Sequence, residues 1–196
     1  MTLKDRINEA FSVLIGFPLW GATRTMDLEM FNFGDRRTRL NRKGQEVDVG
    51  EYALHVQCPW RIVGPDGIIA ASEDRKYPEE EMADWEEFDS DSPSRCEARM
   101  AAWLREHCLA PLKVDRVEAD SVGGFRLLLQ LGFALEAFPA HSLRGEYSEY
   151  WRLFRPSMET SHFVVTGHGV EDNRRQRDPS GETGMLQSEI THKPSE

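Results

Sequence analysis

The chain has 196 residues, and its 34 acidic against 24 basic residues give a formal net charge of -10. This charge disfavours nucleic acid and anionic membranes as general partners, because both bind positively charged surfaces. No stretch approaches the roughly 18 consecutive apolar residues of a membrane-spanning helix, and the N-terminus lacks the pattern of a secretory signal. We therefore expect a cytoplasmic protein that does not bind membranes.

The distribution of apolar residues predicts one domain followed by a tail. A chain of 22.5 kDa buries about 70% of its extended surface on folding, which is enough for one core. Apolar patterns run through residues 1–170, whereas residues 171–196 are rich in Arg, Asp, Ser, Glu and Gly and have no apolar period. We expect a single domain over 1–170 and a disordered tail over 171–196.

The first predicted elements are a helix and a strand. Thr2 and Asp5 have the spacing of a capping box, and a stripe of apolar residues follows on one helical face until Gly16. From Trp20 the period changes to two and predicts a strand as far as Phe33. A turn or wide hairpin is then expected over residues 33–44, which include the basic run 35–43 with a net charge of +4.

The clearest strand pattern covers residues 52–62. Six apolar residues alternate along it and predict one buried face: Tyr52, Leu54, Val56, Cys58, Trp60 and Ile62. His55, Gln57 and Arg61 are expected on the opposite face. Pro59 lacks an N–H group and predicts an edge strand or a bulge. The turn signal Gly64–Gly67 makes this strand the first arm of a hairpin that returns over residues 68–71.

The remaining elements complete a mixed pattern. A helix is predicted to begin at Ser92-Pro93 and to end before Pro111, with Cys96, Met100, Trp103, Leu104 and His107 on its inward face. Short apolar segments between residues 112 and 166 then predict an antiparallel meander. The fold class that follows is α+β, a mainly antiparallel β-sheet with an N-terminal helix and one central helix packed on it. One curved sheet and two packed sheets are both compatible with the pattern.

Sequence motifs indicate no cofactor and no metal. Nucleotide-binding loops, nucleophile elbows and metalloprotease signatures are all absent from the sequence. Three cysteines without C-x-x-C spacing, Cys58, Cys96 and Cys108, are typical of reduced and mostly packed thiols. His162 and His168 fit a strand that ends in a glycine turn better than they fit a metal site.

Residues 73–91 carry ten acidic and two basic residues, a net charge of -8. Aromatic residues within an acidic segment favour binding of a basic protein partner, because aromatics form buried contacts and carboxylates steer the encounter. The residues we expect at such an interface are Glu80, Asp84, Trp85, Glu87 and Phe88. An intramolecular role is the alternative, in which the acids solubilise an exposed loop and the aromatics fasten it to the core.

A second function class remains open. His55, Gln57 and Arg61 are polar residues on one predicted strand face, and they would suit a small enzyme or a small-ligand-binding domain if they converge over a pocket. The sequence favours a non-enzymatic binding protein over this alternative. Exposed methionine and aromatic faces on several strands also leave a homodimer possible.

Three segments carry a resemblance to other proteins. The patterns Tyr52–Ile62, Glu149–Phe154 and His162–Val165 resemble a family of small bacterial cytosolic proteins of unknown function, over about residues 20–170. In its acidic composition and single-domain layout, the chain is similar to immunity proteins that neutralise a secreted toxin. This resemblance implies binding to a protein partner and assigns no catalytic residue.

Overall fold

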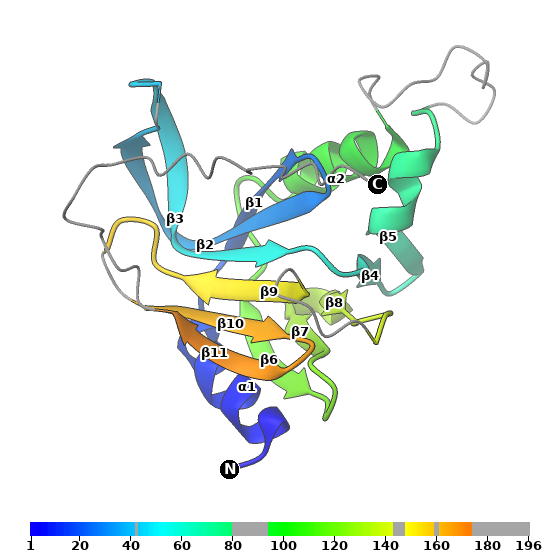
Figure 1. Ribbon diagram of the computed structural model, residues 1–196. Coiled ribbons are helices and arrows are strands. Elements are labelled where there is room, and N and C mark those ends of the chain that lie inside the picture. The colour runs from blue at the N-terminus through cyan, green and yellow to red at the C-terminus, as the bar shows by residue number, and fades with distance from the viewer. Residues whose placement is uncertain (42, 80–93, 143–147, 159–160, 174–196) are drawn as a thin grey trace, which may run out of the picture.

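The computed structural model describes residues 1–41, 43–79, 94–142, 148–158 and 161–173. They form two antiparallel sheets and two α-helices, which confirms the α+β fold with two sheets rather than one (Figure 1). The six-stranded sheet has the order β1-β2-β3-β9-β10-β11, with strands Leu19–Thr25, Leu28–Leu40, Glu46–Val56, Glu149–Phe154, His162–Thr166 and Gly169–Asn173. The five-stranded sheet has the order β5-β4-β8-β7-β6, with strands Gly67–Ala71, Trp60–Gly64, Ala134–Ala137, Phe125–Leu129 and Val114–Ala119.

Each α-helix begins at a capping box. Helix α1, Leu3–Phe11, is capped by Thr2 together with Asp5, as the sequence predicts. Helix α2, Arg95–Glu106, is capped by Ser94 together with Glu97, so the predicted start at Ser92-Pro93 was two residues early. The prediction missed the start by two residues because Ser94 and Glu97, like Thr2 and Asp5, have capping-box spacing. The described residues also form three short 3-10 helices: η1 (Ser12–Leu14), η2 (Ser72–Lys76) and η3 (Gln130–Gly132).

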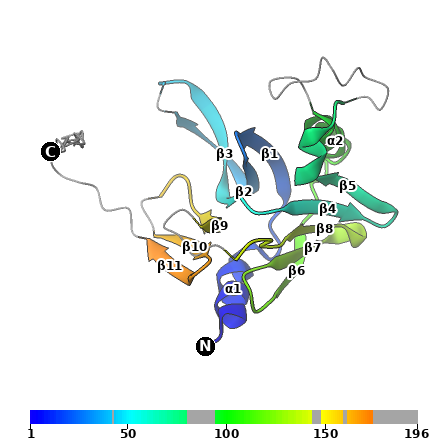
Figure 2. The same cartoon turned by 45° about the vertical axis from the view of Figure 1, so that its right-hand side comes forward.

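The core lies where α1 and the two sheets meet. Phe11 of α1 packs its ring 4.7 Å from Phe125 of β7 and 4.9 Å from Trp151 of β9, so one helical side chain joins both sheets. Trp151 is fully buried and donates its Nε1–H to the carbonyl of Gly123 at 2.7 Å. Figure 2 shows α1 against β6 at one end of the molecule and α2 against β5 at the other.

The chain changes sheets within the segment that was predicted as one strand. Strand β3 ends at Val56, and the N–H groups of Gln57 and Cys58 still bond to the carbonyl of Tyr150 in the six-stranded sheet. Strand β4 then begins at Trp60 and pairs with β8 of the other sheet. The predicted alternation of buried residues continues across the break, because both sheets face the same core. Pro59 lies at the break, where no ladder N–H is required.

The first hairpin also differs from the prediction. A two-residue turn at Met26 and Asp27 separates β1 from β2, with Met26 at φ 53°, so residues 20–33 are two strands. The expected turn near Gly34 is a bulge inside β2, which continues to Leu40. A Cβ on Gly50, across the bulge, would lie 2.5 Å from the carbonyl oxygen of Tyr52. Only glycine therefore fits where the two strands bend.

The second half confirms the predicted meander but divides it between the sheets. Strands β6, β7 and β8 join the five-stranded sheet, and β9, β10 and β11 join the six-stranded one. Strand β11 reaches Asn173, so the ordered fold extends three residues into the segment expected as a tail. The rest of that segment, 174–196, lies outside the described residues.

Candidate binding cleft

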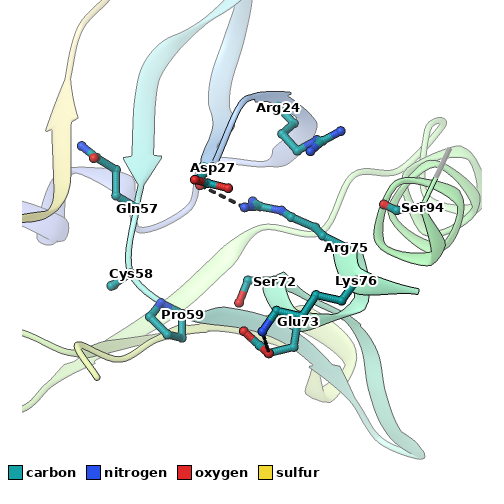
Figure 3. Close-up of a pocket in the computed structure, with 10 residues that line it drawn as sticks. All are labelled: Arg24, Asp27, Gln57, Cys58, Pro59, Ser72, Glu73, Arg75, Lys76 and Ser94. Atoms are coloured by element: carbon teal, nitrogen blue, oxygen red, sulfur yellow. Dashed lines mark hydrogen bonds and ion pairs between the residues drawn. The ribbon is translucent and has the colours of Figure 1, made fainter. Parts of the chain in front are cut away.

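A cleft of about 350 Å³ lies where the chain passes from one sheet to the other (Figure 3). Four parts of the fold meet around it: the β1–β2 hairpin turn, the β3–β4 crossover, η2 and the N-terminus of α2. Its lining residues are Arg24, Asp27, Gln57, Cys58, Pro59, Ser72, Glu73, Arg75, Lys76 and Ser94. Its size is at the lower end of the range for ligand cavities, roughly 300–1,000 Å³.

Arg75 of η2 lies across this cleft. Its side chain is 13% exposed and donates from Nη1 to the backbone carbonyl of Asp27 and from Nη2 to Oε2 of Glu29, both at 2.9 Å. The guanidinium carbon also lies 5.8 Å from the ring centre of Trp60. Arg75 therefore fastens η2 to the β1–β2 hairpin through charge-assisted hydrogen bonds.

Glu29 is the buried partner of Arg75. Its side chain is 6% exposed, and this burial raises the pKa of the carboxyl to about 7, although the hydrogen bond and the charge of Arg75 act in the opposite direction. Glu97 nearby raises the pKa further, and Arg24 lowers it. The charge of Glu29 therefore changes near neutral pH.

The carboxylates around the cleft differ in their partners. Arg24 pairs with Glu97 at 2.6 Å, and Lys76 pairs with Glu73 at 2.6 Å on the exposed rim. Asp27 also lines the cleft, yet its carboxylate forms no ion pair with any residue that the structure describes. Its backbone carbonyl accepts a hydrogen bond from Nη1 of Arg75.

The two buried thiols near the cleft are not nucleophiles at neutral pH. Burial raises the pKa of Cys58 to about 12, and burial together with the charge of Glu29 raises that of Cys96 to about 12. Both are therefore protonated thiols, as expected for packed cysteines. Cys108 is exposed at the end of α2.

The residues predicted for partner binding, Glu80, Asp84, Trp85, Glu87 and Phe88, lie outside the described residues. The structure does describe both ends of their segment. Pro78 and Ser94 form an isolated antiparallel bridge, and Arg95 donates its backbone N–H to the carbonyl of Tyr77 at 3.0 Å. Pro78 and Ser94 therefore lie next to each other, and Ser94 also lines the cleft.

His55, Gln57 and Arg61 lie in three different surroundings. Gln57 lines the cleft, whereas His55 and Arg61 are not among its lining residues. His55 belongs to the six-stranded sheet, with its ring 4.7 Å from that of Phe154. Burial, followed by the charges of Arg152, His162 and Arg39, lowers the pKa of His55 to about 4.

Arg61 belongs to the five-stranded sheet, in a row of charged residues that crosses four strands. Arg61 and Arg126 both pair with Glu136, at 2.6 and 2.9 Å. Glu118 of β6 is the cross-strand neighbour of Arg126 and completes the row. His55 and Arg61 lie on different sheets, and neither of them lines the cleft together with Gln57.

Sequence reasoning missed Arg24, Asp27, Glu29 and Arg75. One signal for Glu29 was present, since it shares the strand period of Phe31 and Phe33, which are both fully buried. A carboxylate on a buried face requires a partner. Nothing in the sequence identifies Arg75 as that partner, because 46 positions separate the two residues.

Comparison of the chain with family models, curated proteins and solved structures gives no match. Within the described part of the chain, no three His, Cys, Asp or Glu side chains lie close enough to hold a metal ion. None of the helices formed by the described residues is long and apolar enough to span a membrane.

Proposed function

We propose that this protein is a non-enzymatic binding protein that engages a basic protein partner through its acidic segment 73–91. The observation that supports the proposal is the bridge between Pro78 and Ser94, the residues on either side of the acidic run 79–91. The segment has a net charge of -8, which favours a basic partner.

The base of the segment is firmly attached to the fold. Arg75 ties η2 to the β1–β2 hairpin, and Ser94 begins α2 through its capping box with Glu97. A rigid base lowers the conformational entropy that is lost when a partner binds. Trp85 and Phe88 within the segment are aromatic residues of the kind enriched in interface cores, and tryptophan is also enriched among hot spots.

Affinity capture from a lysate of the source organism tests the proposal. The wild type is compared with a variant in which Glu79, Glu80, Glu81, Glu86 and Glu87 are changed to Gln, at low and at high salt. We expect a stoichiometric basic partner that the wild type retains at low salt and releases at high salt, because solvent-exposed charges are screened.

A matched control separates this segment from general surface charge. Five exposed carboxylates elsewhere, none of them in an ion pair with a described residue, are changed to amides: Glu9, Asp35, Glu46, Asp66 and Glu106. The proposal requires that this control still captures the partner and that the segment variant does not. Equal capture by both variants and the wild type would contradict it.

A further inference from the structure

The outer face of the six-stranded sheet carries a cluster of arginine and histidine side chains. His55 of β3 is the cross-strand partner of Arg152 of β9, and both lie on the face opposite to the fully buried Trp151. The ring of Phe154 lies 4.7 Å from that of His55 and stacks on that of His162 at 4.3 Å. Nη1 of Arg152 lies 3.4 Å from Nδ1 of His162. One guanidinium and two imidazoles therefore share this face across three neighbouring strands, β3, β9 and β10.

The β2–β3 hairpin brings a second arginine to this cluster. Strand β2 is bulged between Phe33 and Arg36, and the part of the hairpin beyond the bulge rises out of the sheet in Figure 1. Arg39 lies in this part and donates from Nη1 to the carbonyl of Pro156 at 3.4 Å, so its side chain reaches the segment that follows β9. The charge of Arg39 also acts on His55. The bend of the hairpin therefore brings the guanidinium of Arg39 near the ring of His55.

The excess charge beside His55 is positive. Arg152 is paired with Glu149, whose Oε1 accepts from its Nε at 2.6 Å. Arg39 forms no ion pair with any residue that the structure describes, so its charge is not compensated. Glu171 is a further carboxylate on this face, but it belongs to β11, three strands from β3. That separation is roughly 14 Å at normal strand spacing, beyond the Debye length of about 8 Å at physiological salt.

The ring of His55 has polar atoms without a partner in the described part of the chain. The ring is partly buried and meets Phe154 edge to face, and no described residue forms a hydrogen bond with it. Burial and the neighbouring cationic groups lower the pKa of His55 to about 4, so the imidazole is neutral at pH 7 and donates from one nitrogen. Two guanidiniums and an imidazole N–H are donors of the kind that bind an oxyanion.

We propose that this cluster binds a small oxyanion of the phosphate type between the guanidiniums of Arg39 and Arg152, with the ring N–H of His55 as a third donor. The planar donors of arginine fit the oxygen atoms of a phosphate group, and the bound anion compensates the charge of Arg39. The same two guanidiniums disfavour a cationic ligand. The inference is independent of the acidic segment, and it stands whether or not that segment binds a partner.

Titration of the full chain with inorganic phosphate at constant ionic strength, followed by NMR of the backbone amides, tests this inference. The variants are Arg39→Gln and, as a matched control, Arg36→Gln. Both arginines are exposed residues of β2 without an ion pair to a described residue. Arg36 lies on the opposite face of the strand, with its guanidinium carbon 4.4 Å from the ring centre of Trp20. Each substitution removes one positive charge, so a non-specific effect of net charge is the same in both.

We expect saturable shifts of the His55 and Arg152 amides in the wild type. Arg39→Gln should weaken phosphate binding by at least about threefold, and Arg36→Gln should change it by less than about twofold. His55→Phe keeps an aromatic ring against Phe154 but removes the donor, so it should also weaken binding. The absence of saturable shifts in the wild type, equal effects of the two arginine variants, or wild-type affinity of His55→Phe would overturn the inference.

A parallel titration with phenyl phosphate distinguishes two sources of the same chemistry. Tighter binding of phenyl phosphate than of inorganic phosphate supports a phosphate group that is carried by an organic molecule. Equal or weaker binding of phenyl phosphate supports a free anion.

Discussion

Arg75 and Glu29 form an ion pair in the interior of the protein, with 2.9 Å between Nη2 and Oε2. The pair connects η2, at the start of the acidic segment, with β2 of the six-stranded sheet. Desolvation opposes the charged form of the pair, and the raised pKa of Glu29 reports this cost. The attachment of the acidic segment therefore depends on a group that titrates near neutral pH.

The stability of the protein should depend on the ionisation of Glu29. Its pKa is about 7 in the folded protein against 4.5 ordinarily, so between these values the folded state binds more protons than the unfolded state. The stabilisation of the folded state by protonated Glu29 is fully present below about pH 4.5 and is lost as the pH rises through 7. Urea unfolding should show a loss of up to about 3 kcal/mol across this window, relative to Glu29→Gln. Parallel pH profiles of the two proteins would contradict the prediction.

The ionisation of His55 should change the pH dependence of stability in the direction opposite to that of Glu29. Its pKa is about 4 in the folded protein against 6.5 ordinarily, so the unfolded state binds more protons between these values and stability rises with pH. The gain relative to His55→Gln should reach no more than about 2 kcal/mol, because the imidazole is only partly buried. Parallel pH profiles of the wild type and His55→Gln would contradict this prediction.

Gly50→Ala should destabilise the bend of the β2–β3 hairpin. The added Cβ would lie 2.5 Å from the carbonyl oxygen of Tyr52 and 2.7 Å from the backbone nitrogen of Phe33, so the backbone must move. We expect a loss of at least about 2 kcal/mol in the free energy of unfolding. Gly21→Ala is the matched control in the same sheet, because its nearest contact would be 3.5 Å. Similar unfolding midpoints for the two variants would count against this account of the bend.

Glu136→Gln should leave two arginines without their carboxylate. Arg61 and Arg126 both pair with Glu136, but each is more than 40% exposed, so solvent screens the interaction. We expect a loss of about 1 kcal/mol at low salt, which decreases as the salt concentration rises. Glu118→Gln removes the more exposed pair with Arg116 and should cost less. Chemical denaturation at two salt concentrations measures both effects.

Local signals in the sequence predicted many elements correctly. Thr2 and Asp5 form the capping box of α1, and Gly64–Gly67 joins β4 to β5 as the turn pattern indicates. The same kind of signal explains the error at α2, where two candidate caps lie close together in sequence. A capping box or a tight turn involves residues within about four positions, so the sequence contains all its parts.

The sequence predicted neither the turn at Met26 nor the change of sheet at Pro59. The change of sheet was missed for a reason other than the error at α2. The apolar alternation of residues 54–62 is the same whether the segment remains in one sheet or passes to a second sheet over the same core. Periodicity reports which face is buried and not which strand is the neighbour. The hydrogen-bond partners decide the sheet, and they come from β8 and β9, more than 70 residues away.

The residue types along the chain already show an acidic segment with embedded aromatic residues, which we propose binds a partner, and no nucleotide or metalloprotease motif. That Asp27, Gln57 and Ser94 surround one cleft, and that Arg75 pairs with Glu29, follows from the three-dimensional arrangement of the strands. The physical reason is that charge and apolar period are properties of each residue type. A cleft and a buried ion pair depend on contacts between segments that are distant along the chain. Those segments come together only when the two sheets fold.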